Sequence, residues 1–265
     1  MKPNPINTDI FNIINNRRSI RKFLDKDIPD DVLKDILHAG IRAPFAAQLY
    51  SVIYTRNHDK MRLKSGVYPS TSVFVLFLLD FNKIEKIVKQ RNYKYDYDDG
   101  MLLWLGLQDV TCVAENMILA AEAYGLGSVL LGAIPLQADL IKEMFNLPNR
   151  VFPTIGLCLG YPDPSFGTDT RPRYPLKFTA FKDTYNDPSD EDIEEMMKAM
   201  DEGYITQGYY IKQRAKIAFK DGRADEIDYD KYSWSEHISR KLIQGIWGEE
   251  RLFEILERHG INVNK

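Results

Sequence analysis

A long apolar stretch near the middle of the chain limits the possible folds of this sequence more than any other feature. Residues 101–124 read MLLWLGLQDVTCVAENMILAAEAY, and at helical spacing their apolar side chains fall on nearly every side. A helix that is apolar all round is buried, because no side of it favours contact with water. The sequence therefore predicts a long helix at the centre of the fold or between two subunits.

Short apolar runs on both sides of this helix predict strands. Residues 72–79 read SVFVLFLL, an unbroken apolar run that is typical of a strand covered on both faces. Further elements are expected as strands at 50–55, 128–134 and 151–159, and as helices at 8–16, 30–43, 82–91 and 136–145. This mixture predicts an α+β core in residues 1–187.

The composition changes after about residue 162. Residues 163–187 are rich in proline, threonine and arginine and are expected to be irregular. Ser189 and Asp192 then match a capping-box pattern at a helix start, and two more helices are expected at 235–247 and 249–259. We therefore predict two domains, 1–187 and a helical C-terminal extension, 188–265. The extension carries too many apolar residues to stay solvated, so we expect it to pack on the core or on a partner subunit.

Composition and charge argue against several classes of protein. The net charge of −3 disfavours a nucleic-acid-binding surface. Cys112 and Cys158 lie in apolar runs, which favours buried free thiols, and the four histidines lack the spacing of a metal site. The N-terminus has no apolar signal segment, and the run 72–79 is too short to span a membrane. The sequence predicts a cytoplasmic protein without metal or membrane, in which the acidic stretch 95–99 is a solvated loop.

A basic stretch, RRSIR, follows the first predicted helix. In an extended backbone Arg17, Ser19 and Arg21 project from one face, with Arg18 beside them. Two guanidinium groups and a hydroxyl on one face suit a phosphate or another oxyanion. The alternative is a solvated basic helix end, which the helix dipole also favours.

Two later segments bear on the same question. The sequence TRPRYP (170–175) holds a second arginine pair, Arg171 and Arg173, which either shares a phosphate with the first or lies in a solvated loop. The glycine run GLGSVLLG (125–132) follows a helix and opens a strand, so it does not fit the dinucleotide-binding motif. We expect Gly125 and Gly127 to end the long helix and Gly132 to let a flat ligand approach the backbone.

Five segments, in order and spacing, resemble those of the FMN-dependent nitroreductases. RRSIRKF is similar to the family's RRSxRxF, and APFAAQLYSV (43–52) to its APSxxNxQPW. GLGSVLLGAIP resembles GLGTxxxGG, IGLCLGYPD matches the strand that ends in GYP, and RPRYP matches the late basic pair. The resemblance covers residues 10 to about 180 and not 188–265. It implies a nitroreductase-like α/β sandwich, with a central, mostly antiparallel sheet flanked by helices, and a homodimer with FMN at the subunit interface.

The resemblance also assigns residues to the cofactor. It implies that Arg17, Ser19 and Arg21 bind phosphate, ribityl and pyrimidine oxygens of FMN, that Arg171 and Arg173 complete the phosphate site, and that the backbone at Gly132 and Ala133 faces flavin N5. The other subunit would contribute Pro44, Phe45, Ala46 and Gln48. No side chain is expected to be catalytic. Phe45, Gln48 and Tyr50 depart from the family's serine, asparagine and glutamine, and we expect the two aromatic rings to narrow the substrate pocket.

The resemblance implies an oxidoreductase with a ping-pong scheme. NADH or NADPH reduces the flavin and departs, and a small acceptor (a nitroaromatic, a quinone or an activated alkene) then takes the electrons. Two alternatives remain. One is a specialised enzyme of the same fold, such as a dehalogenase or a flavin-consuming enzyme, and the other is a non-catalytic flavin-binding or sensory protein. A nucleic-acid-binding module ranks lowest, because no aromatic platform flanks the basic run.

Overall fold

The computed structural model describes residues 9–61, 66–167, 169–244 and 251–263. The chain forms two compact units, one made of Met1–Gly167 with Glu250–Lys265 and the other of Thr168–Glu249. This division differs from the predicted boundary after residue 187, because the irregular segment packs with the helices that follow it. Within the second unit, for example, Lys177 pairs with Glu195 at 2.6 Å, and the ring of Tyr174 contacts that of Trp234. Residues 1–8, which bear on the signal-peptide prediction, lie outside the described residues. So do residues 245–247 and 249–250, which belong to the two helices predicted at 235–247 and 249–259.

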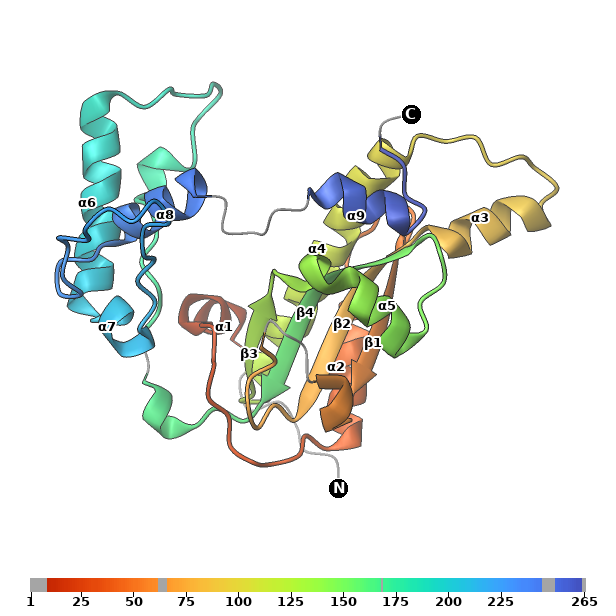
Figure 1. Cartoon of the computed structure of the whole chain (residues 1–265). Helices are drawn as coiled ribbons and strands as arrows, with labels where there is room; N and C mark the ends of the chain where they lie inside the picture. Colours follow the sequence, from red (N-terminus) through yellow and green to blue (C-terminus); the bar gives the residue numbers. More distant parts are fainter. Residues whose placement is uncertain (1–8, 62–65, 168, 245–250, 264–265) are drawn as a thin grey trace. The chain divides into compact units, whose positions relative to one another are not determined.

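A four-stranded sheet forms the centre of the first unit, with strand order β1-β2-β4-β3 (Figure 1). Every neighbouring pair is antiparallel, which confirms the predicted sheet. The strands are β1 (Tyr50–Thr55), β2 (Val73–Asp80), β3 (Gly127–Leu131) and β4 (Val151–Gly160). All residues of β2 are buried, as its unbroken apolar run predicts. The strand predicted to reach residue 134 ends at Leu131. The chain then turns into a 3-10 helix, η2 (Ile134–Gln137), which has a proline in its first turn and so cannot continue the strand.

Helices cover both faces of this sheet. Alternate residues of β2 pack on opposite sides: Val73, Val75 and Phe77 contact the core cluster beneath α2 and α4, and the residues between them contact the cluster beneath α5. The helices of this unit are α1 (Ile10–Asn16), α2 (Asp30–Ile41), α3 (Phe81–Gln90), α4 (Asp99–Ala123), α5 (Ala138–Phe145) and α9 (Leu252–Arg258), with 3-10 turns η1 (His58–Met61) and η3 (Pro164–Phe166).

Helix α4 is the long helix that the sequence predicts, and it is only partly buried. One side packs on α2, where an added Cβ at Gly40 would lie 2.4 Å from Met117. The other side leaves Met101, Trp104 and Leu107 exposed by 45%, 66% and 42%. Among the described residues, α4 is long and apolar enough to cross a membrane, a test that core helices of soluble proteins also pass. The exposed apolar stripe instead suits a partner surface.

The last described segment, residues 251–263, packs on the first unit. Ile255, Leu256 and Ile261 are buried in one core cluster with residues of β2, α3 and β4. Its anchor is Arg150, whose Nη1 donates to the carbonyl oxygen of Gly260 and to Asp99, each at 2.6 Å. The predicted C-terminal extension is therefore divided between the two units.

The acidic stretch 95–99 differs from the expected solvated loop at its last residue. Asp99 is nearly buried, forms an ion pair with Arg150 and accepts a hydrogen bond from the backbone N–H of Asn262 at 2.7 Å. Hydrogen bonds from Arg150 and Asn262 hold the pKa of Asp99 below its usual value, although burial acts in the opposite direction. Asp99 therefore ties the start of α4 to the C-terminal segment.

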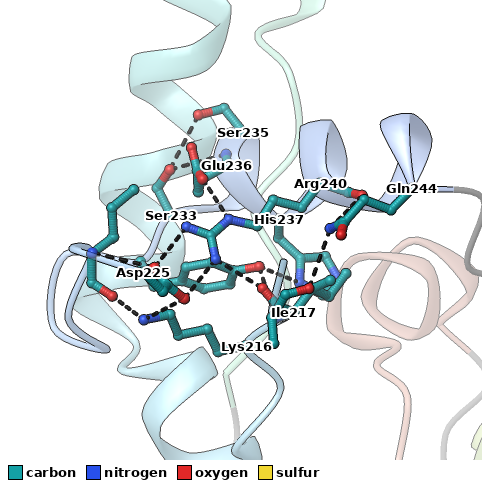
Figure 2. Close-up of polar contacts among 12 residues, drawn as sticks. Lys216, Ile217, Asp225, Ser233, Ser235, Glu236, His237, Arg240 and Gln244 are labelled. Atoms are coloured by element: carbon teal, nitrogen blue, oxygen red, sulfur yellow. Dashed lines mark hydrogen bonds and ion pairs between the residues drawn. The ribbon is translucent and has the colours of Figure 1, made fainter. Parts of the chain in front are cut away.

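The second unit is helical, with η4 (Leu176–Phe178), α6 (Asp190–Thr206), α7 (Tyr209–Gln213) and α8 (Trp234–Ile243). The predicted capping box is present, since Ser189 and Asp192 each accept a hydrogen bond from the other's backbone N–H. Arg240 of α8 is buried, and its guanidinium group lies among the polar contacts drawn in Figure 2. Its guanidinium group donates to Asp225, Glu236 and the carbonyl oxygen of Ile217. These bonds hold the non-helical segment 214–232 against α8.

Candidate functional site

The basic segment 17–21 crosses the open edge of the sheet beside β3. Arg17 is the C-cap of α1, and from there the backbone is extended, as predicted. Ser19 forms a parallel bridge with Ser128, and the backbone N–H of Ile20 donates to the carbonyl oxygen of Ser128 at 2.8 Å. These contacts place the three arginines at the start of β3.

Gly127 allows this close crossing. A Cβ at this position would lie 2.6 Å from Ile20 Cγ1 and 2.9 Å from Pro162 Cγ, closer than real Cβ contacts. The sequence predicted that Gly125 and Gly127 both end the long helix. Gly125, with φ of 70°, does follow the C-cap of α4, but Gly127 is the first residue of β3. A glycine is needed at position 127 because the basic segment packs closely against it, and not because the chain turns there.

Unpartnered polar atoms gather at the same crossing. Across the described ranges, four buried side-chain polar atoms have no hydrogen-bond partner: Arg18 Nε, Glu122 Oε1, Ser128 Oγ and His259 Nδ1. Ser128 is paired with Ser19, and Glu122 feels the charges of Arg17 and Arg18. Each unpartnered buried group costs about 1–3 kcal/mol, so three in one neighbourhood indicate a bound group or ordered water that completes them.

The electrostatics of this neighbourhood favour an anion. Burial raises the pKa of Glu122 to about 7, and the charges of Arg18 and Arg17 only partly offset this effect. In the part of the chain that the structure describes, none of the guanidinium groups of Arg17, Arg18 and Arg21 hydrogen-bonds a carboxylate, and Arg21 donates only to the carbonyl oxygen of Ser19, at 3.4 Å. The segment therefore presents an excess of positive charge beside a carboxyl group that is half protonated near neutral pH.

Gly132 and Ala133 lie at the other end of β3, in the turn that leads into η2. An added Cβ at Gly132 would meet nothing within 4 Å, so the backbone is open on that side. Ser128 and Gly132 are separated by four residues of extended chain, about 13 Å. One strand therefore carries the basic crossing at one end and an accessible backbone at the other, an arrangement that fits an elongated ligand with an anionic end, such as FMN.

The loop between α2 and β1 carries Pro44, Phe45, Ala46 and Gln48, all of them exposed. Asp109 of α4 holds this loop in place, and the sequence analysis missed this residue. It is 2% exposed and accepts hydrogen bonds from the backbone N–H groups of Ala46 at 2.7 Å and Leu49 at 3.0 Å. Asp109 is the one acidic residue in the run 101–114 of the sequence, and this isolated charge was the signal that could have identified it.

The two aromatic departures from the family pattern differ in position. Phe45 is 55% exposed on the loop and free to contact a ligand or a partner chain. Tyr50 is 7% exposed and packs in the core cluster beneath α2 and α4, so the expectation that its ring lines a pocket is wrong. The reason is its place as the first residue of β1, where the side chain points into the core.

Arg171 and Arg173 lie in the second unit. The guanidinium group of Arg171 donates to Gln207 Oε1 at 2.8 Å and stacks over the ring of Tyr209, with 4.0 Å between Cζ and the ring centroid. Arg173 is exposed, and its Nη1 donates to the carbonyl oxygens of Arg171 and Pro172. The two arginine pairs thus belong to different compact units, and a phosphate shared between them stays a prediction.

Comparisons with known proteins agree with the motifs. The model of the Nitroreductase family matches residues 14–65 and 68–161. The chain is 30% identical over 229 residues to an NADPH-dependent oxidoreductase of Staphylococcus epidermidis, covering 83% of this chain and 89% of that protein. It is 28% identical over 233 residues to the NADPH-flavin oxidoreductase of Vibrio harveyi, covering 85% and 87%.

A solved structure extends this similarity. The crystal structure of nitroreductase A from Vibrio parahaemolyticus matches with a TM-score of 0.76 at 26% identity and covers 97% of this chain and 99% of that one. The similarity therefore continues beyond about residue 180, where the recognisable motifs stop. The helices of the second unit are part of the shared fold and not an unrelated extension.

Proposed function

Because this chain belongs to the nitroreductase family, we propose that it is an FMN-dependent oxidoreductase that takes electrons from NADH or NADPH. The observation that carries the proposal is the cluster of unpartnered polar atoms of Arg18, Glu122 and Ser128. It lies within the residues that match the family and at the position where the sequence predicts a phosphate. FMN, when bound, accepts a hydride at N5 and passes the electrons to a second substrate.

The residues of the chain bind and orient the cofactor. Arg17, Arg18 and Arg21 neutralise the phosphate and the oxygens near it, and the Ser19 hydroxyl adds a neutral hydrogen bond. That Arg171 and Arg173 also bind the phosphate stays a prediction from the family resemblance. The open backbone at Gly132 and Ala133 lets the flavin ring approach, because no Cβ occupies that side of Gly132.

The protein works as a homodimer in this proposal. Met101, Trp104 and Leu107 form an exposed apolar stripe on α4, and Phe11 of α1 is 75% exposed. A second copy that covers these side chains removes them from water. The loop with Pro44, Phe45, Ala46 and Gln48, held in place by Asp109, then reaches the flavin of the partner subunit.

No strong general acid or base is assigned, since electron transfer through the flavin does not require one. The acceptors are nitroaromatics, quinones or activated alkenes, and Phe45 is the residue of this chain that limits their size. The cytoplasmic location stays a prediction.

Purification and anaerobic reduction test the proposal. The protein should purify with a non-covalent flavin that mass spectrometry identifies as FMN after heat release. NADPH or NADH should bleach the flavin absorbance within the dead time of manual mixing, and an acceptor from the panel should restore it. A protein without flavin, or with FAD, would refute the cofactor assignment. Slow bleaching by both donors would favour a flavin-binding protein without catalysis.

A further inference from the structure

Glu122 is a half-buried residue whose carboxyl group lies near the arginines of the basic segment without a hydrogen bond to them among the described residues. It lies in the last turn of α4, just before the turn that leads into β3. Its Oε1 is buried and has no hydrogen-bond partner among the described residues, and the same holds for Arg18 Nε. A buried carboxylate is normally paired and hydrogen-bonded, because the low dielectric makes an isolated charge costly. Because Glu122 Oε1 and Arg18 Nε form no hydrogen bond, the guanidinium group of Arg18 stays available to bind another anion.

The charges that act on the carboxyl group of Glu122 belong to two arginines of the basic segment. Arg18 and Arg17 lower its pKa, while burial has the larger effect and raises the pKa to about 7. Helix α1 and strand β3, which adjoin the site, contain no charged residue. On α2, Asp31 and Asp35 act on Tyr124, whose hydroxyl donates to Asp35. The charges that shift the pKa of Glu122 against the effect of burial are therefore those of Arg18 and Arg17.

We propose that Glu122 is a positioning residue of the anion site and that its carboxylate takes up a proton from solvent when a phosphate binds beside Arg17 and Arg18. This inference rests on the proposed function, in which FMN supplies the phosphate. Without ligand, the ionised carboxylate attracts the two guanidinium groups and keeps the basic segment in place. A bound dianion engages those groups and repels a carboxylate nearby. Protonation removes the repulsion, so FMN binding and proton uptake are coupled.

The variant Glu122→Gln separates this role from a structural one, because the amide has the shape of the carboxyl group and no charge. We expect parent and variant apoproteins to bind FMN equally at pH 6, where Glu122 is mostly protonated. At pH 9 the variant should bind about tenfold more tightly, which corresponds to ~1.4 kcal/mol of repulsion. Protonation of the FMN phosphate itself, near pH 6, affects both proteins alike and cancels in the ratio of their dissociation constants.

Calorimetry gives a second readout that does not depend on turnover. At pH 8, FMN binding to the parent apoprotein in Hepes and in Tris should reveal a fractional proton uptake, and Glu122→Gln should show none. Glu143→Gln, a charge change at an exposed position of α5, should behave like the parent. Equal pH dependence and equal proton uptake in the parent and Glu122→Gln would overturn the inference while leaving the FMN assignment intact. A parent that binds no FMN at any pH would instead defeat the proposed function and this inference with it.

Discussion

At the scale of single residues, the site is defined by charges that are left without partners. Arg17, Arg18 and Arg21 are half-buried, yet within the described residues none of them hydrogen-bonds a carboxylate. Arginine normally finds a carboxylate or a backbone oxygen when it is withdrawn from water. A segment that keeps three guanidinium groups available at one crossing is suited to hold an anion of more than one charge.

Replacing Arg17 with Ala should weaken FMN binding by roughly 10- to 150-fold, since a hydrogen bond to a charged group contributes about 1.5–3 kcal/mol. Arg173→Ala should behave alike, and the double variant should lose less than the sum if both side chains contact one phosphate. Titration of apoprotein with FMN, followed by flavin fluorescence, measures both effects. Arg91→Ala, at an exposed position after α3, serves as the charge-matched control. Unchanged affinity in both single variants would mean that these arginines are surface charges.

Asp109 gives a prediction about stability. Asp109→Ala should lower the free energy of unfolding by about 2–3 kcal/mol, because the backbone N–H groups of Ala46 and Leu49 lose a charged acceptor. Asp109→Asn keeps one acceptor oxygen and should lose about half of that. Urea denaturation measures the change, and Asp96→Asn, in an exposed loop, should stay within ~0.5 kcal/mol of the parent. An Asp109→Ala protein as stable as the parent would show that the loop does not depend on this side chain.

Residue identity alone locates some of these groups and not others. The basic segment is recognisable because arginines, a serine and their spacing are all visible in the sequence. Glu122, Asp109 and Tyr50 were missed or misjudged because their importance comes from burial. A glutamate in AAEAYG could face water, and a tyrosine after a loop could face a ligand, until the packing of α4 and β1 decides it.

At the scale of elements, β3 positions both ends of the proposed cofactor. It is an edge strand of the described sheet, and its outer edge forms a short bridge to the basic segment at Ser19. Edge strands offer unpaired backbone groups to whatever lies beside them. Gly127 of β3 is tightly packed, whereas Gly132 in the turn after β3 faces open space. Substitutions at the two positions therefore test the packing of the strand and its proposed contact with the ligand separately.

Gly127→Ala should destabilise the protein by about 1–3 kcal/mol, because its methyl group collides with Ile20 and Pro162 and forces the basic segment away. Gly132→Ala should leave the free energy of unfolding unchanged, since its methyl group enters open space. The same methyl group should weaken FMN binding if the flavin ring approaches the backbone there. Thermal unfolding and FMN titration of both variants give four measurements. If Gly132→Ala binds FMN as tightly as the parent, the flavin ring does not lie against this turn.

Element types were predictable wherever the apolar pattern was long. The buried strand β2, the helix α4 and the capped start of α6 follow from local sequence, since each pattern matches one period over its whole length. The division of the C-terminal region was not predictable, because it depends on contacts between distant residues, such as those of Arg150 with Gly260 and Asp99. The end of β3 is a local effect of the turn into η2, and its signal was the proline in the first turn of η2.

At the scale of the whole molecule, the exposed apolar stripe of α4 is the surface through which we expect two copies of the chain to form a homodimer. Trp104 is 66% exposed at the middle of this stripe, and large aromatic side chains at the centre of an interface contribute much of its binding energy. In the proposed homodimer, the loop with Phe45 completes the flavin site of the partner subunit. Dimerisation and cofactor binding should therefore be lost together.

Replacing Trp104 with Glu should produce a monomer at micromolar concentration, because a charge would be buried without a partner in the interface. Light scattering should give a mass near the 30.7 kDa of one chain, whereas the parent should give twice that mass. The variant should also lose FMN during gel filtration. Tyr93→Glu, at a position that is 72% exposed in the loop after α3, is the matched control. A parent that scatters as a monomer while it retains FMN would contradict the shared site.

Residues 251–263 return to the first unit and complete its core, so this core can be completed only at the end of translation. The ribosome delivers the residues of the sheet first and those of the second unit next. Ile255, Leu256 and Ile261 are the last part of the core to emerge. A nascent chain interrupted before them leaves Phe81 and Phe152 uncovered, even though every predicted FMN-binding residue has already been translated. Proteases and chaperones that survey exposed apolar surface can therefore distinguish a finished copy from a truncated one.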